Sequence, residues 1–151
     1  MISIQKGLST VIHKGRMEQI NDNPIIIYDG AHNEPAIKNF QDMVKMYYNK
    51  MKRVYIISIL KRKDYNKMLK LIAQDKEAKF ILTSGNNSET YASGDELFEC
   101  IKQFTEIDKI YKKNLDDAIK EALNSNIDTV NFVIGSFYTY GTVIDIIQKN
   151  K

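Results

Sequence analysis

Cysteine is almost absent from this sequence of 151 residues, in which Cys100 is the only one. A single cysteine excludes an internal disulfide and any metal site built from several thiolates. No apolar run approaches the roughly 20 residues that a membrane-spanning helix needs, and residues 1–10 lack the apolar centre of a signal peptide. We therefore expect a cytoplasmic protein that makes no contact with a membrane.

Neither sign of charge dominates the chain, which has 22 basic and 19 acidic residues and a net charge of +3. The charges are mixed along the sequence, so we expect no nucleic-acid partner. Two phosphate-binding fingerprints are also missing, because neither Gly-x-Gly-x-x-Gly nor Gly-x-x-x-x-Gly-Lys-Ser/Thr occurs anywhere in the chain. The sequence therefore has neither a dinucleotide-binding turn nor a P-loop.

What the sequence does contain is an alternation of short apolar runs with amphipathic stretches of helical period. Strands are expected at residues 24–29, 53–58, 78–82, 107–111 and 129–134, and helices at 35–49, 64–74, 95–105, 115–123 and 139–149. Residues 16–20 precede a polar turn and should form an antiparallel hairpin with the first long strand. The pattern predicts an α/β fold, a Rossmann-like three-layer sandwich with a mainly parallel sheet of about six strands, one of them antiparallel.

The segment Asp29-Gly30-Ala31-His32-Asn33 follows the first long strand of this prediction. Ligands of open α/β sheets bind outside the carboxyl ends of the strands, and Asn33 suits the N-cap of a helix whose free N–H groups favour anions. Asp29 could accept hydrogen bonds from a ribose, and His32 could donate to a phosphate. A second interpretation stays open, in which Asp29 and Asn33 only cap the turn and His32 is exposed.

Two more loops at the same edge carry polar residues. The cluster from Lys61 to Asp64 could neutralise a carboxylate or a phosphate, or it could be a solvated loop in which Asp64 caps the next helix. In residues 135–141, Gly135 allows a tight turn, and Ser136 could cap a helix or bind an anion. Cys100, on the apolar side of a helix, is expected to be a packed small residue and not a nucleophile.

Four segments together resemble one family in their order and spacing: Gly15-Arg16-Met17-Glu18, Asp29 to Asn33, Leu60 to Asp64, and Gly135-Ser136-Phe137-Tyr138. They resemble the carboxyl-terminal domain of folylpolyglutamate synthases and dihydrofolate synthases, in the Mur ligase superfamily. The resemblance implies that residues 15–151 are such a domain and that residues 1–14 are a linker or the remnant of an upstream ATPase domain.

The resemblance also implies a reaction. The family transfers the γ-phosphate of ATP, with Mg²⁺, to a carboxylate of pteroate or folate, and the amine of L-glutamate then attacks the acyl phosphate. ATP, folate and L-glutamate are thus the implied partners, together with an upstream domain that carries the P-loop and the magnesium ligands. We expect no metal ligand in this chain, and no turnover by the chain alone.

Residue roles follow from the matching positions of the family. The resemblance assigns Arg16 to the nucleotide phosphates, Asp29 to the ribose, and His32 to the vicinity of the phosphates, so that Arg16 and His32 are the catalytic candidates. The positions on the glutamate side are matched by Lys63, Asp64 and Ser136.

Two positions depart from the family pattern. Lys14 stands where the family usually has a proline, and Glu89 lies in a loop that often contains an arginine. Two other interpretations also stay open: a free-standing α/β nucleotide-binding or interaction module without catalysis, and a Mur-type peptide ligase domain. The second is disfavoured by the Asp29-Gly30-Ala31 reading, because cell-wall Mur ligases usually have a tyrosine before the Ala-His pair.

Overall fold

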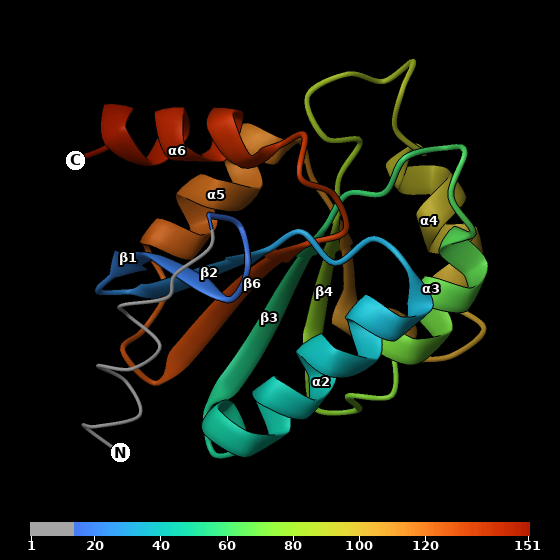
Figure 1. Cartoon of the computed structure of the whole chain (residues 1–151), viewed down its shortest axis with the longest axis horizontal. Coiled ribbons are helices and arrows are strands. Elements are labelled where there is room, and N and C mark those ends of the chain that lie inside the picture. The colour runs from blue at the N-terminus through green and yellow to red at the C-terminus, as the bar shows by residue number, and fades with distance from the viewer. Residues whose placement is uncertain (1–13) are drawn as a thin grey trace.

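The computed structural model describes residues 14–151, and the expectation of an upstream linker falls almost entirely outside this range. Six strands form one sheet in the order β1-β2-β6-β3-β4-β5 (Figure 1). Their bounds are Glu18–Asp22 (β1), Ile25–Asp29 (β2), Lys52–Ile57 (β3), Lys79–Leu82 (β4), Ile110–Lys112 (β5) and Thr129–Ile134 (β6). β1 pairs antiparallel with β2, and all other neighbours are parallel. The predicted mixed sheet is therefore confirmed.

Within residues 14–151, five α-helices cover the two faces of this sheet (Figure 1). They are Glu34–Tyr48 (α2), Tyr65–Ile72 (α3), Gly94–Ile101 (α4), Leu115–Leu123 (α5) and Tyr140–Lys149 (α6). The chain moves in one direction across the sheet from β2 to β5, so right-handed crossovers place α2, α3 and α4 on one face. It then returns to β6, between β2 and β3, and this reversal places α5 on the opposite face. The three-layer architecture follows.

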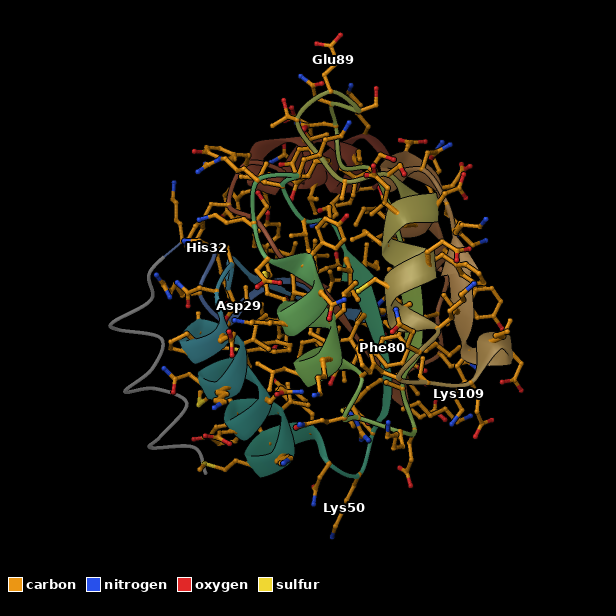
Figure 2. All side chains as sticks on the ribbon, turned by 90° about the vertical axis from the view of Figure 1, so that its right-hand side faces the viewer. Asp29, His32, Lys50, Phe80, Glu89 and Lys109 are labelled. Carbon is orange, nitrogen blue, oxygen red and sulfur yellow. The ribbon has the colours of Figure 1, made fainter. Side chains whose placement is uncertain are left out.

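Each face of the sheet has its own core, because alternate side chains of a strand point to opposite faces. Under α2, α3 and α4 the rings of Tyr55, Phe80 and Phe132 stack, with Tyr55 5.7 Å from Phe80 and 5.4 Å from Phe132 between centroids. Figure 2 labels Phe80, which belongs to this core between the sheet and the helices α2, α3 and α4. The second core lies under α5 and α6 and includes Tyr28 and Ile56. No helix in the described part of the chain is long and apolar enough to cross a membrane.

The structure differs from the sequence expectation mainly at the ends of elements. The first strand begins at Glu18 and not at residue 16, because Gly15 and Met17 have positive φ angles of 75° and 41° and form a turn. Residues 107–109 form a 3-10 turn before a shorter β5. Helix α4 ends at Ile101, four residues earlier than the pattern suggested.

Candidate functional site

The chain crosses the sheet in one direction from β2 to β5 and then returns, so that β6 lies between β2 and β3. The loops after β2 and β6 lead to helices on opposite faces, α2 and α6, and the space between such diverging loops is where open α/β sheets bind ligands. The loop after β3 ends beside them, and so does the turn before β1. Arg16, Asp29, His32, Lys63 and Ser136 therefore all lie at this edge of the sheet, where Figure 2 labels Asp29 and His32.

Asp29 is the last residue of β2, and its side chain is 6% exposed. One carboxylate oxygen accepts a hydrogen bond from the amide of Ala31 at 2.8 Å, and the other accepts from the amide of Met17 at 3.1 Å. Burial raises the pKa of Asp29, against the opposing effects of these two donors and of the nearby Arg16 charge. Asp29 thus fastens the turn around Arg16 to the end of β2.

The turn around Arg16 is fixed by the loop that follows β2. The amide of Gly30 donates to the carbonyl of Gly15 at 2.6 Å, which adds to the bond between Met17 and Asp29. Arg16 itself is exposed, and its guanidinium carbon lies 5.1 Å from the centroid of the Phe137 ring. This is a cation–π arrangement, and it places the arginine charge over the Phe137 ring at this edge of the sheet.

Phe137 is the residue that joins these segments. The sequence analysis placed it in the Gly135 to Tyr138 segment but assigned it no role of its own. Its ring lies under Arg16, meets the ring of His32 edge-on with centroids 5.7 Å apart, and covers Gly30. A Cβ atom on Gly30 would overlap the ring, and one on Gly15 would lie 3.1 Å from it. Gly30 is therefore needed because an aromatic ring from a distant loop occupies the space of a Cβ atom, whereas Gly15 is favoured by its φ of 75° and by the tight contact with the same ring.

His32 is half-buried, and its Nδ1 lies 2.9 Å from the carbonyl oxygen of Gly30. A carbonyl oxygen only accepts, so this contact requires the proton to be on Nδ1. Nε2 is then the ring nitrogen left to meet a ligand. His32 is held by its own loop and by Phe137, which is the pre-organisation that a ligand-binding histidine requires.

A cavity of about 220 Å³ opens beside His32. Its walls come from the loops after β2, β3 and β6, and its lining consists of His32, Leu60, Arg62, Lys63, Ser136, Phe137 and Tyr138. Arg62 and Lys63 are cationic, and none of these lining residues is acidic. The cavity therefore favours an anionic group.

Ser136 is buried, and its hydroxyl is engaged from two sides. The amide of Tyr138 donates to its Oγ at 3.0 Å, and the hydroxyl of Tyr91 lies 3.1 Å from the same atom. Tyr28 donates to the carbonyl oxygen of Ser136 at 2.5 Å. Tyr28 and Tyr91 thus shape the loop that lines the cavity, and neither was identified from the sequence.

Lys63 and Asp64 take different places in the structure although they are neighbours. Lys63 lines the cavity, whereas Asp64 is exposed and caps α3 by accepting from the amide of Lys67 at 3.2 Å. The contacts of Asp64 therefore match the interpretation in which this residue caps the next helix. Glu89, in the loop where the family often has an arginine, is exposed at the tip of that loop and points away from His32 in Figure 2.

A second cavity, of about 240 Å³, lies at the opposite end of the strands, near the start of β3. Its polar centre is Arg53, which donates to both carboxylate oxygens of Asp75 at 2.6 and 2.9 Å and to three backbone carbonyls. Tyr55 also donates to Asp75 at 2.7 Å. Since these groups satisfy one another, we assign this cluster to the core and not to ligand binding.

The chain resembles known proteins in sequence over much of its length. A family model described as "Mur ligase, glutamate ligase domain" matches residues 15–137. The dihydrofolate synthase/folylpolyglutamate synthase of Bacillus subtilis (strain 168) is 29% identical over 68 residues, which are 45% of this chain and 16% of that protein.

Solved structures resemble the chain over nearly its whole length. Folylpolyglutamate synthase of Mycobacterium tuberculosis, complexed with ADP and AMPPCP, matches with a TM-score of 0.80 at 19% identity, over 96% of this chain and 34% of the other. The bifunctional folylpolyglutamate synthase/dihydrofolate synthase of Yersinia pestis, complexed with AMPPNP and Mn, matches with a TM-score of 0.76 at 20% identity, over 97% and 34%. These likenesses confirm the predicted fold, and the chain spans about a third of the length of both structures.

Proposed function

Since the chain belongs to the Mur ligase glutamate ligase domain family, we propose that it is the carboxyl-terminal domain of an ATP-dependent ligase that adds L-glutamate to a folate. The observation that carries this proposal is the meeting of three loops and the Arg16 turn at one edge of the sheet, beside a cationic cavity. The relatives named above as folylpolyglutamate and dihydrofolate synthases support the substrate class.

The nucleotide side of the site is formed by Arg16, Asp29 and His32. Arg16 presents its guanidinium over the Phe137 ring and binds the phosphates, where planar arginine donors match the oxygens of a phosphoryl group. His32 contributes Nε2, the ring nitrogen that the contact with Gly30 does not use, to the same phosphate site. Asp29 accepts from the ribose with the lone pairs that its two backbone donors leave unused.

The glutamate side is formed by the cavity next to His32. Lys63 and Arg62 bind carboxylate groups of the incoming amino acid, and Ser136 presents a fixed polar wall. Asp64 contributes indirectly, because its cap holds the first turn of α3 directly after Lys63. Catalysis of this kind rests on positioning the amine against the acyl phosphate and on stabilising the phosphoryl charge.

ATP and Mg²⁺ are the proposed cofactors, and an upstream domain supplies the P-loop, the magnesium ligands and most of the folate site. In residues 14–151 no group of three or more His, Cys, Asp or Glu side chains could hold a metal ion. The divalent ion would neutralise phosphate charge during transfer, while Arg16 and His32 act on the same phosphates from this domain. The chain alone is then inactive.

Titration of the isotope-labelled chain with ADP, followed by NMR, tests the nucleotide site. We expect the shifts to concentrate at residues 30–33 and 136–138, and we expect Arg16→Ala and His32→Ala to weaken binding by about tenfold, as loss of a charged hydrogen bond predicts. Lys50→Ala is the matched control, because Lys50 is exposed at the opposite edge of the sheet. Shifts centred on Arg53 and Asp75 would refute the assignment.

A titration with L-glutamate tests the second half of the site. We expect Lys63→Ala to abolish the response of Ser136 and Tyr138, whereas Lys61→Ala, an exposed neighbour outside the cavity lining, should leave it intact. Release of ADP from ATP by the chain alone, with folate and L-glutamate present, would show that no second domain is needed and would overturn the division of labour proposed here.

A further inference from the structure

The turn that carries Arg16 has an unusual backbone. Gly15 and Met17, on either side of Arg16, both have positive φ angles, and this region is unfavourable for a residue with a side chain such as Met17. Such a conformation persists only where surrounding contacts hold it. Two of these contacts come from the last residue of β2 and the residue after it: Asp29 accepts from the amide of Met17, and Gly30 donates to the carbonyl of Gly15.

A third contact comes from Glu18, the first residue of β1. Its carboxylate accepts from the amide of Gly15 at 2.8 Å and so closes the turn around Arg16. The same carboxylate accepts from the hydroxyl of Tyr140, at 3.0 and 2.9 Å to its two oxygens. Glu18 therefore has two partners, Gly15 in the turn around Arg16 and Tyr140 in α6, and it is half-buried.

Tyr140 continues this connection into the loop after β6. It is the first residue of α6, and its ring meets that of Tyr28 edge-on, with centroids 5.1 Å apart. Tyr28 in turn bonds to the carbonyl of Ser136 and lies 2.5 Å from the hydroxyl of Thr139. Ser136 and Thr139 flank Phe137, so the chain of contacts from Glu18 ends at the segment that carries the ring beneath Arg16.

From this geometry we propose that Glu18 and Tyr140 are positioning residues, which hold the Arg16 turn and the Phe137 loop together so that the Arg16 guanidinium stays over the ring. The role in nucleotide binding rests on the function proposed above, whereas the positioning itself does not. Neither side chain lines the cavity beside His32, so both act on a bound nucleotide indirectly, through the position of Arg16 over the Phe137 ring.

Amide hydrogen exchange tests the positioning without any ligand. Glu18→Ala and Tyr140→Phe should each increase the exchange rate of the Gly15, Met17 and Gly30 amides by about three- to tenfold, the factor expected for one hydrogen bond. Glu18→Gln, which keeps an acceptor oxygen, should restore most of the protection. Gln19→Ala, at an exposed neighbour, is the control. Unchanged exchange at these amides in both variants, with the fold intact, would overturn the proposal.

A double-mutant cycle with ADP affinity tests the link to Arg16. Glu18→Ala should weaken ADP binding by about three- to tenfold in the native background, and it should have no effect once Arg16 is alanine. Additive effects would mean that Glu18 acts by another route and would overturn the positioning role. If Arg16→Ala leaves ADP affinity unchanged, the nucleotide site itself is wrong, while the exchange experiment still decides whether Glu18 and Tyr140 hold the turn.

Discussion

The ring of Phe137 lies against Gly30 so closely that a Cβ atom on the glycine would overlap three of its carbons. The two residues are far apart in the sequence, and each belongs to a different loop of the site. The same ring also carries Arg16 and meets His32. One aromatic side chain thus sets the distance between the loops that follow β2 and β6, and several expectations depend on it.

Replacement of Gly30 by alanine should displace this ring. We expect Gly30→Ala to lower the free energy of unfolding by about 1–3 kcal/mol, the usual cost of overpacking, and to weaken ADP binding because Arg16 loses its platform. Urea unfolding and an ADP titration measure the two effects. In a Phe137→Ala background the same Gly30→Ala change should cost much less stability, and an equal cost in both backgrounds would show that the ring is not the obstacle.

Gly135 should be more sensitive than Gly30, because its obstacle is backbone. Its φ is 109°, and a Cβ atom there would overlap the carbonyl oxygen of Ser58. We expect Gly135→Ala to cost about 3 kcal/mol or more. Gly141, early in α6 with open space around it, is the matched control: Gly141→Ala should stabilise by about 0.5 kcal/mol. Thermal unfolding of both variants measures this difference. Similar melting temperatures for Gly135→Ala and Gly141→Ala would contradict the expected sensitivity of Gly135.

The pair of Arg53 and Asp75 should be a major source of stability. Their side chains are 10% and 13% exposed, so Asp75→Ala leaves an almost buried guanidinium without its carboxylate and should cost about 3–5 kcal/mol. Glu77, which is 3.6 Å from Arg53 but 86% exposed, is the control, because Glu77→Ala should cost less than about 1 kcal/mol. Urea unfolding at neutral pH compares the two.

The same pair predicts a dependence of stability on pH. Burial raises the pKa of Asp75, but the hydrogen bonds from Arg53 and Tyr55 and the charge of Arg53 outweigh it and leave the pKa below its ordinary value. A lowered folded-state pKa stabilises the protein above the unfolded value of about 3.9, and this stability is lost as the pH falls through the folded value.

Asp29, with a raised pKa, contributes the opposite slope. The relevant measurement is therefore the difference in unfolding free energy between the native chain and Asp75→Asn at each pH, since Asp29 is common to both. That difference should shrink steadily below about pH 4. A constant difference down to the acid limit would argue against an ionised Asp75 in the folded state.

Cys100 should be unreactive in the folded protein. It is buried at 6% exposure in the core under α2, α3 and α4, and burial, with a smaller effect of the Asp64 charge, raises the pKa of its thiol. A raised pKa lowers the thiolate fraction, and thiolate is the reactive form. A chromogenic disulfide reagent should label Cys100 only after denaturant is added. Rapid labelling of the native chain would contradict this packing.

The sequence alone was sufficient for the order of the elements and for the loops that form the site. Period-two and period-3.6 patterns are local properties of a chain, and so are turn residues such as those of the Asp29 segment. The rule that ligands bind at the carboxyl ends of parallel strands then placed Asp29, His32, Lys63 and Ser136 at one edge, whereas Arg16 was added only by the resemblance to the ligase family. The exact element ends were less predictable, because turns such as Gly15 to Met17 are held by distant partners.

Tertiary structure alone decided which of these side chains line the cavity. Asp64 and Lys63 are neighbours in sequence, but helix capping turns one away while the other lines the cavity. Phe137, Tyr140 and Glu18 became part of the site only because β6 lies beside β2, which brings their loops together. Side-chain contacts between residues more than a hundred positions apart follow from strand order and packing, and the local patterns of a single sequence do not encode either one directly.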